Sequence, residues 1–251
     1  MSEPVIIKLG GSIVTKKSED GVVDSAKIKI LAEQIAPFAG KFPLIIVHGA
    51  GSCGHPEAKA YDIPGGVTKE NAAGIFVTHA AVSRLNRSVV ASLREAGVEA
   101  VSLHPFGCCL AEDGRLVSAG VSQIKEMLAL GIVPVLHGDV VMDTKRGACI
   151  ISGDQIVPYL AVKLGAKRVG IATDVGGVLS NGEIVPEITR ASVGGIDLGG
   201  SSSTDITGGM RGKINELLLL ADEGVDSHIF AADRMADFLS EKNYGGTLVK
   251  K

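Results

Sequence analysis

The sequence predicts an α/β protein, an open three-layer αβα sandwich around a mainly parallel central sheet. Apolar runs of strand length alternate with helical patterns almost from end to end, which is typical of βαβ units. Hydrophobic residues make up 45% of the 251-residue chain, enough for a large core. Glycine accounts for 33 residues, well above its usual share of about 7%, and the glycines cluster where predicted strands end.

The predicted elements alternate along the chain. Apolar residues three and four positions apart, such as Val82, Leu85, Val89 and Leu93, predict one long helix over 68–96 with a single buried face. Further helices are expected over 26–38, 122–130, 155–164 and 209–223. Strands are expected over 5–9, 44–48, 100–103, 132–136, 168–172, 228–231 and 247–249. Residues 140–142 and 148–151 resemble a hairpin, and the polar stretch 194–207 is expected to be a loop.

Composition narrows the range of functions. The net charge is −3 and aromatic residues make up 4%, so the chain lacks the basic surplus and the stacking platforms of a nucleic-acid partner. The four cysteines form no spaced pairs, which favours reduced thiols in a cytoplasmic protein. No apolar run is long enough for a membrane span. We expect one domain over 1–251, with a possible boundary between two lobes near Ile151.

Five glycine clusters lie at predicted strand or helix ends. They are Gly10–Ser12, Gly49–Gly54, Ser152–Asp154, Gly176–Gly177 and Thr207–Gly209. Ligands of open parallel sheets bind beyond the carboxyl ends of the strands, and glycine amides at a helix start attract phosphate. One such loop alone is commonly only a turn. Lysines accompany these loops at Lys8, Lys16, Lys17 and Lys213, and together they predict a polyphosphate site with a second anionic group.

Several familiar motifs match only in part. The stretch from Gly11 to Lys17-Ser18 has a lysine where the second glycine of a P-loop belongs. The GxGxxG pattern over 49–54 lacks a carboxylate at the end of a second strand, since Glu70 starts a predicted helix. His48, His55, His104 and His137 lack zinc-ligand spacing, and no GxSxG elbow supports a Ser-His-Asp hydrolase. No metal site in the protein is therefore expected.

Two histidines flank the second glycine loop. His48 ends a predicted strand, where a packing role is expected. His55 follows Gly54 and precedes Pro56, and proline suits the first turn of a helix. The imidazole of His55 is therefore expected to face whatever anion the loop holds.

The chain resembles the amino acid kinase superfamily and, within it, archaeal-type isopentenyl phosphate kinases. The resemblance covers nearly the whole chain, and the Gly-His-Pro ending of the second loop is its most discriminating part. The matching motifs are Lys8-Leu-Gly-Gly-Ser12 with Thr15 and Lys17, His48-Gly-Ala-Gly-Ser-Cys-Gly-His-Pro56, Leu136-His-Gly-Asp139, Ile151-Ser-Gly-Asp154, Ile156-Val-Pro-Tyr159, Thr173-Asp174, and Asp205-Ile-Thr-Gly-Gly-Met210 with Lys213.

The resemblance implies an enzyme that transfers the γ-phosphoryl group of ATP, with Mg²⁺ held mainly by the ATP phosphates, to isopentenyl phosphate in an isoprenoid pathway. It also implies a homodimer, an acceptor-binding lobe over about 1–151 and a nucleotide-binding lobe over about 152–251. No nucleic-acid or membrane partner is implied. Phosphoryl transfer fits the residues, because it needs positioning and charge rather than a covalent nucleophile.

Residue roles carry over by position. The catalytic set would be Lys8, Lys17, His55, Asp154 and Lys213. The ATP site would comprise Lys8, Leu9, Gly10, Gly11, Ser12, Gly51, Asp174, Gly208, Gly209 and Lys213. The acceptor phosphate would meet Ala50, Gly51, Gly54, His55 and Gly153. Ile75 and Thr78 lie three apart on one helical face, which in this fold would look toward the end of the acceptor site.

The chain departs from the family pattern at three positions. Ala50 stands where glycine is usual, Cys53 where phenylalanine is usual, and Gly176 where an aspartate is common. The first two touch the acceptor loop and leave the acceptor's identity open, and the third leaves the nucleotide base preference open. The alternatives are a fosfomycin-type phosphonate kinase, another small-acceptor kinase of the same superfamily, and a ligand sensor without activity.

Overall fold

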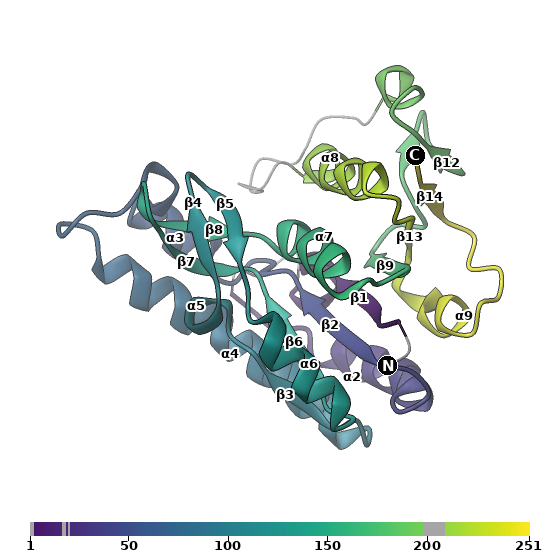
Figure 1. Cartoon of the computed structure of the whole chain (residues 1–251), viewed down its shortest axis with the longest axis horizontal. Coiled ribbons are helices and arrows are strands. Elements are labelled where there is room, and N and C mark those ends of the chain that lie inside the picture. The colour runs from purple at the N-terminus through teal and green to yellow at the C-terminus, as the bar shows by residue number, and fades with distance from the viewer. Residues whose placement is uncertain (1–2, 17–18, 20, 198–208) are drawn as a thin grey trace.

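A central sheet of eight strands organises the protein (Figure 1). The computed structural model describes residues 3–16, 19, 21–197 and 209–251. The strand order is β12 (Glu187–Ile188), β14 (Thr247–Val249), β13 (Ser227–Ala231), β9 (Arg168–Thr173), β1 (Val5–Leu9), β2 (Leu44–His48), β6 (Val133–His137) and β3 (Ala100–Ser102). Neighbouring strands are parallel except for β13 and β14. The predicted mainly parallel sheet is confirmed.

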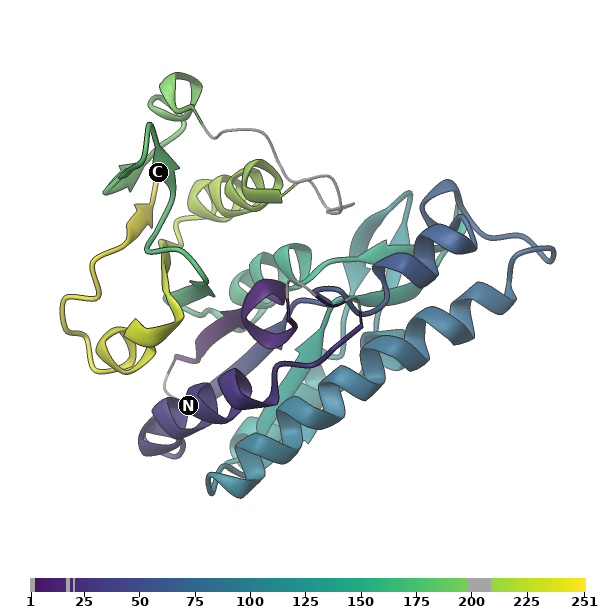
Figure 2. The same cartoon turned by 180° about the vertical axis from the view of Figure 1, so that it is seen from behind.

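Helices cover both faces of the sheet. One face carries α6 (Val121–Ala129), α7 (Gly153–Leu164) and α8 (Gly209–Asp222), and the other carries α2 (Ser25–Ile35), α4 (Ala73–Glu95) and α9 (Met235–Leu239). Figure 2, seen from behind, shows α2 and α4 in front of the sheet. Successive strand residues point to opposite faces, so Ile6 packs with α7 and α8 while Ile7 packs with α2 and α4. The three-layer sandwich is thereby confirmed.

A smaller sheet of four strands lies beside α3 (His55–Ala60) and α5 (Pro105–Cys108). Its order is β5 (Arg115–Ser118), β4 (Leu110–Glu112), β7 (Asp139–Asp143) and β8 (Gly147–Ile151). The predicted hairpin is confirmed, with β7 antiparallel to β8. The strands β4 and β5, and the pair β10 (Leu179–Ser180) and β11 (Glu183–Ile184), were not predicted.

The long helix starts later than the sequence pattern predicts. It begins at Ala73 rather than at residue 68. The side chain of Asn71 accepts from the Thr68 N–H at 2.8 Å and donates to the carbonyls of Tyr61 and Gly66 at 2.9 and 3.0 Å. These bonds hold 68–72 as a turn, because asparagine side chains compete with helical backbone bonds.

The remaining short elements are α1 (Gly11–Val14) and the 3₁₀ turns Ala36–Phe38, Ile63–Gly65, Val193–Gly195 and Ala232–Arg234. Most of the polar stretch predicted as a loop, residues 198–207, lies outside the described residues. Among the residues that are described, no helix has the length and apolar character needed to cross a membrane.

Candidate active site

The parallel strands end at one edge of the sheet, where their loops meet. The Gly10 N–H donates to the Ala172 carbonyl at 2.9 Å, the Gly49 N–H to Leu9 at 2.8 Å, and the Gly138 N–H to His48 at 3.1 Å. These bonds extend the ladder of β9, β1, β2 and β6 by one residue. The predicted glycine loops after β1 and β2 therefore lie side by side at the edge where open sheets bind ligands.

The first two loops touch through their glycines. A Cβ added at Gly11 would lie 2.5 Å from the Gly51 nitrogen, and one added at Gly51 would lie 2.7 Å from the Gly11 oxygen. Gly51 also has a φ of +57°, which favours glycine. Only residues without side chains allow this approach, so the backbones of the two loops pack directly against each other.

Two lysines share one carboxylate beneath these loops. Lys8 Nζ lies 2.6 Å from Asp154 Oδ1, and Lys213 Nζ donates to the same oxygen at 3.0 Å. The three side chains come from β1, the first turn of α7 and the first turns of α8. All three are nearly buried, with exposed fractions of 4%, 13% and 12% for Lys8, Asp154 and Lys213. The structure thus brings together three residues of the predicted catalytic set.

Burial and charge set the protonation of this cluster. Burial lowers the pKa of Lys8 to about 8, with the Lys213 charge acting in the same direction and Asp154 opposing it. Burial acts to raise the pKa of Asp154, but the charges of Lys213 and Lys8 outweigh it and hold that pKa well below its usual range. When both lysines are protonated, the cluster holds two ammonium groups on one carboxylate, and ammonium groups bind phosphate.

Other predicted nucleotide residues lie around this cluster. The Ser12 hydroxyl in α1 donates to Asp174 Oδ1 at 2.8 Å, which ties the loop after β1 to the loop after β9. Gly153 lies against the cluster, because a Cβ there would be 3.0 Å from Lys8 Cε. Gly209 opens α8. Two predicted residues, Lys17 and Gly208, lie outside the described residues.

The second glycine loop, Gly49–Gly54, which is predicted to hold the acceptor, ends in a short helix. Gly54 caps α3 with a φ of +86°, and its N–H donates to Glu57 Oε2 at 2.9 Å. His55 is the first residue of α3, and Pro56 lies in the first turn, as the sequence predicted. The Cys53 N–H donates to the Ala50 carbonyl at 3.0 Å. The loop is therefore fixed in shape on both sides of His55.

An apolar cluster lies next to the second glycine loop, between α3, α4, β7 and β8. Its buried members are Ala58, Ile63, Val140 and Ala148, and its half-buried members include Val67, Ile75, Phe106 and Ile150. Ile75 thus faces other apolar side chains. Thr78, one turn further on, is 2% exposed and lies close to Gly54. Its hydroxyl has no hydrogen-bond partner among the described residues.

Two buried histidines support the loops from below. His48 and His137 are register partners on β2 and β6, with ring centroids 5.3 Å apart. Each ring donates its Nδ1–H to the carbonyl of the next residue, Gly49 or Gly138, at 2.9 and 3.0 Å. Burial lowers their pKa values to about 4 and about 3. Both rings are neutral at neutral pH, which fits the structural role predicted for His48.

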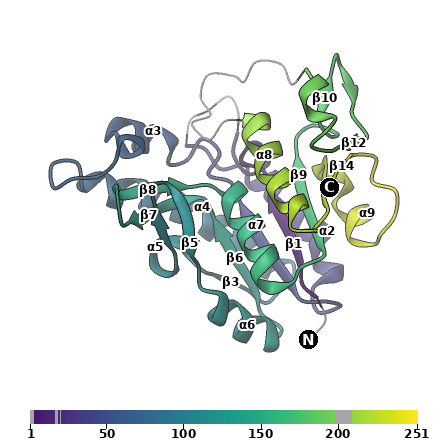
Figure 3. The ribbon, with the colours of Figure 1, turned by 45° about the horizontal axis from the view of Figure 1, so that its top comes forward.

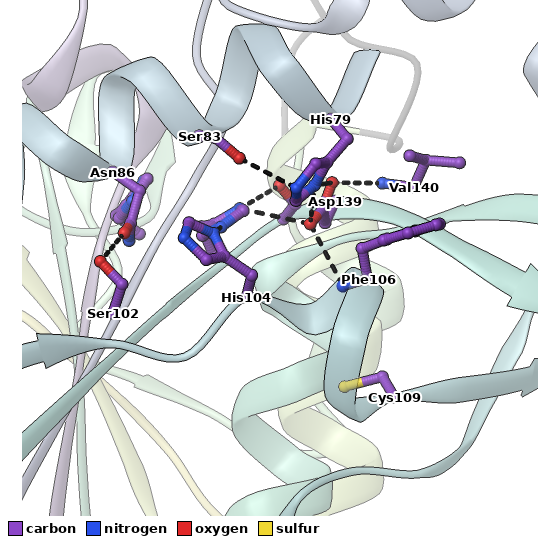
Figure 4. A network of polar contacts seen from close by, with 12 residues as sticks. His79, Ser83, Asn86, Ser102, His104, Phe106, Cys109, Asp139 and Val140 are labelled. Atoms are coloured by element: carbon purple, nitrogen blue, oxygen red, sulfur yellow. Dashed lines mark hydrogen bonds and ion pairs between the residues drawn. The ribbon is translucent and has the colours of Figure 1, made fainter. Parts of the chain in front are cut away.

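Sequence reasoning missed a polar network on the neighbouring wall (Figure 4). Asp139, whose side chain is fully buried, accepts from His79 Nδ1 at 2.9 Å, from the Phe106 N–H at 3.2 Å and from the Val140 N–H at 2.9 Å. It therefore joins α4, α5 and β7. The position of Asp139 directly after Gly138 in a family motif could have marked it as functional. Nothing in the sequence indicated that its partner would be His79, which lies 60 residues away.

The Ser83 hydroxyl lies 3.2 Å from His79 Nε2 and completes a serine-histidine-aspartate alignment. Ser83 stands in the middle of α4, where backbone N–H groups serve the helix, so the alignment offers no oxyanion site. Among the described residues, no group of three or more histidine, cysteine, aspartate or glutamate side chains could hold a metal ion.

Comparison with known proteins defines the class first. A model of the amino acid kinase family matches residues 3–231. The fold and the lysine-lined glycine loops agree with that class.

Relatives narrow the assignment. Isopentenyl phosphate kinases of Haloferax volcanii and Methanothermobacter thermautotrophicus are each 40% identical to the chain, with 96% and 91% of both partners covered. A solved isopentenyl phosphate kinase structure is 33% identical and covers 98% of this chain and 100% of its own, with a TM-score of 0.85. The chain therefore belongs to the isopentenyl phosphate kinases of the amino acid kinase family.

Proposed function

We propose that the protein transfers the γ-phosphoryl group of ATP to isopentenyl phosphate, giving isopentenyl diphosphate and ADP. The observation that carries this proposal is the Lys8–Asp154–Lys213 cluster under two touching glycine loops, in a chain whose relatives carry that activity by name. The phosphonate-kinase alternative is not favoured, because these relatives act on isopentenyl phosphate.

The site suits direct transfer between two phosphates. An oxygen of the acceptor phosphate attacks the γ-phosphorus, and the bond from that phosphorus to the bridging oxygen of ADP breaks. The attacking oxygen is already anionic, so no base has to remove a proton. Catalysis then depends on holding two repelling anions together and on stabilising the charge of the transferring group. Lys8 and Lys213 supply that charge, and Asp154 fixes both ammonium groups.

The two substrates approach this cluster from different loops. For ATP we propose the backbone from Leu9 through Ser12, with Gly51, Asp174, Gly208 and Gly209. For the acceptor phosphate we propose Ala50, Gly51, Gly54, His55 and Gly153. Lys17 is proposed as a third cation on the transferring group. The ammonium groups of Lys8 and Lys213, held beside the two glycine loops, support the binding of such anions.

The apolar tail is proposed to enter the cluster formed by α3, α4, β7 and β8, with Ile75 in its end wall and Thr78 nearby. Carbon chains bind through buried apolar area, and Ile75 packs among apolar side chains there.

Mg²⁺ is proposed to enter with ATP, neutralising phosphate charge. On the family resemblance we also propose the acceptor lobe over about 1–151, the nucleotide lobe over about 152–251 and a homodimer. The cysteine pattern supports a cytoplasmic location.

A single-turnover assay with γ-labelled ATP tests this function. The acceptors are isopentenyl phosphate, dimethylallyl phosphate, fosfomycin, carbamate and acetylglutamate, each supplied with Mg²⁺. We expect label to pass to isopentenyl phosphate with the highest kcat/KM. Preferred transfer to fosfomycin would overturn the assignment, and ATP binding without transfer to any acceptor would favour the ligand-sensor alternative.

A further inference from the structure

An ion pair joins the small sheet to the helix that carries Lys213. Arg115, in β5, places Nη1 at 2.5 Å from Glu216 Oε1 and Nη2 at 3.1 Å from Glu216 Oε2. Glu216 lies three residues after Lys213 in α8. A two-point contact between guanidinium and carboxylate fixes orientation as well as distance. The pair therefore constrains how the first turns of α8 face the small sheet.

The β4–β5 hairpin, which contains Arg115, also holds α7, the helix that carries Asp154. Gln155, the next residue in α7, donates from Nε2 to the Gly114 carbonyl and accepts the Leu116 N–H, both at 3.3 Å. In Figure 3, β5 and α8 flank α7. The hairpin is thus bound to both helices beside the two residues that form the Asp154–Lys213 ion pair at 3.0 Å.

The hairpin is itself firmly anchored. The Asp143 carboxylate, at the end of β7, accepts the N–H groups of Asp113 and Gly114 in the β4–β5 turn at 3.1 and 2.7 Å. It also accepts the N–H groups of Lys145 and Arg146 at 2.8 and 2.9 Å. One carboxylate therefore ties the β4–β5 turn to the β7–β8 turn, and the hairpin can serve as a rigid support.

The Arg115–Glu216 ion pair is not needed to hold α8 against α7. The Arg115 side chain is 55% exposed, its partner Glu216 is 15% exposed, and the pair borders an open groove of about 370 Å³ between α7 and α8. Below that groove the helices share a buried apolar core that includes Ile156, Leu160 and Leu217. Exposed ion pairs add little to global stability, whereas a small misplacement of a catalytic group can cost a large factor in rate.

We propose that Arg115 and Glu216 are positioning residues, which hold the first turns of α8 so that Lys213 stays on Asp154. Neither residue belongs to the substrate sites proposed above. The proposal rests on the proposed kinase function, and its effect is on the transition state, where the Lys213 charge meets the transferring group. It predicts a loss in kcat with little change in KM.

Steady-state kinetics with isopentenyl phosphate test the proposal. Arg115→Ala and Glu216→Gln are expected to lower kcat about 5- to 20-fold with both KM values within about twofold of wild type. Arg115→Lys, a single-point contact, is expected to fall between these variants and wild type. The exchanged pair Arg115→Glu with Glu216→Arg restores the contact and is expected to recover most of the activity. Wild-type kcat in the single variants, or an exchanged pair as slow as they are, would overturn the proposal.

The chain offers a matched control on the same helix. Arg190 makes a two-point contact with Asp222, whose side chain is more exposed than that of Glu216. Asp222 is the last residue of α8 and lies far from Lys213 along the helix. Arg190→Ala is expected to leave kcat unchanged. An equal loss of kcat in this variant would mean that any exposed ion pair of α8 matters, and the positioning role would fall.

Hydrogen exchange separates this proposal from the proposed function. Arg115→Ala is expected to speed amide exchange in the first two turns of α8 about fivefold or more, and Arg190→Ala is expected to leave those amides unchanged. This readout needs no acceptor. A wild-type protein inactive on isopentenyl phosphate would refute the proposed function alone, whereas unchanged exchange in Arg115→Ala would refute the positioning role.

Discussion

The ammonium group of Lys8 and the carboxylate of Asp154 meet at 2.6 Å, with only 4% of the Lys8 side chain exposed. A lysine in that position holds its proton less tightly than usual, because burial penalises the charged form. In the proposed mechanism, Lys8 acts in its charged form. The pH dependence of the enzyme should therefore report this pair.

We expect kcat/KM to fall as the pH rises through about 8, the pKa of Lys8 in the free protein. Bound phosphates favour the protonated amine, so the same limb in kcat should lie at higher pH. Asp154→Asn removes a charge that raises the Lys8 pKa, and its basic limb in kcat/KM should move to lower pH. Rate profiles from pH 6 to 10 measure this. If the basic limb did not move in Asp154→Asn, that limb would not report the pKa of Lys8.

Replacing a lysine should act on the chemical step. We expect Lys8→Ala and Lys17→Ala each to lower kcat at least a hundredfold and to change KM far less, since a positioned charge in a water-poor site contributes about 3–5 kcal/mol in the transition state. Lys17 lies outside the described residues, so its prediction rests on the sequence motif. Lys27→Ala, which removes an exposed lysine of α2 paired with Asp24, is the control. Wild-type kcat in both variants would refute the cation assignment.

His55 should serve the acceptor and not the nucleotide. We expect His55→Ala to raise the acceptor KM or lower kcat with ATP affinity nearly unchanged. His55→Gln keeps an N–H donor and should be milder. Kinetics in both substrates, with ATP affinity measured by calorimetry, test this. Weaker ATP binding with a normal acceptor KM would place the loop on the nucleotide side.

Ile75, at the end of the proposed tail site, should limit tail length. Each buried methylene contributes about 0.8 kcal/mol, so a pocket rejects a longer tail only by blocking it. We expect Ile75→Ala to raise kcat/KM for geranyl phosphate relative to isopentenyl phosphate. Phe76→Ala is the matched control, because the neighbouring Phe76 is 75% exposed. An unchanged ratio in Ile75→Ala, or an equal change in the control, would remove Ile75 from the wall.

His48 should contribute to stability more than to catalysis. His48→Ala deprives the Asn86 amide, which donates to His48 Nε2 at 3.0 Å, and the Gly49 carbonyl of partners. Buried groups left unpaired cost about 1–3 kcal/mol each, so we expect a clear fall in Tm with KM values near wild type. A normal Tm together with a raised acceptor KM would contradict the structural role.

The same residue gives stability a pH dependence with a fixed sign. The unfolded chain takes up a proton on His48 near pH 6.5, but the folded protein does so only near pH 4. The contribution of neutral His48 to the free energy of unfolding is therefore complete above pH 6.5 and is lost as the pH falls toward 4. Denaturant unfolding of wild type and His48→Ala across this range should show a shallower loss in the variant. Parallel curves would argue against a neutral buried ring.

The main sheet could be predicted because its buried strands are continuous apolar runs, such as β2 with five buried residues. The strands β4 and β5 were not predicted, because they are short and largely exposed. Their sequences therefore lack the alternation of apolar and polar residues that marks a half-buried strand. The grouping of Lys8, Asp154 and Lys213 was predicted through motifs. Arg115 and Glu216 lie 101 residues apart on elements of which one was not predicted, and no motif marks them.

The contact between Gly11 and Gly51 also limits how the acceptor specificity of such an enzyme could change. A Cβ added at Gly11 would lie 2.5 Å from the Gly51 nitrogen, so under the proposed function the acceptor loop cannot be reshaped without disturbing the nucleotide loop. The proposed tail site, formed by α3, α4, β7 and β8, can vary without moving the Lys8–Asp154–Lys213 cluster. New acceptors should therefore arise from substitutions in that site, with the phosphoryl-transfer apparatus inherited intact.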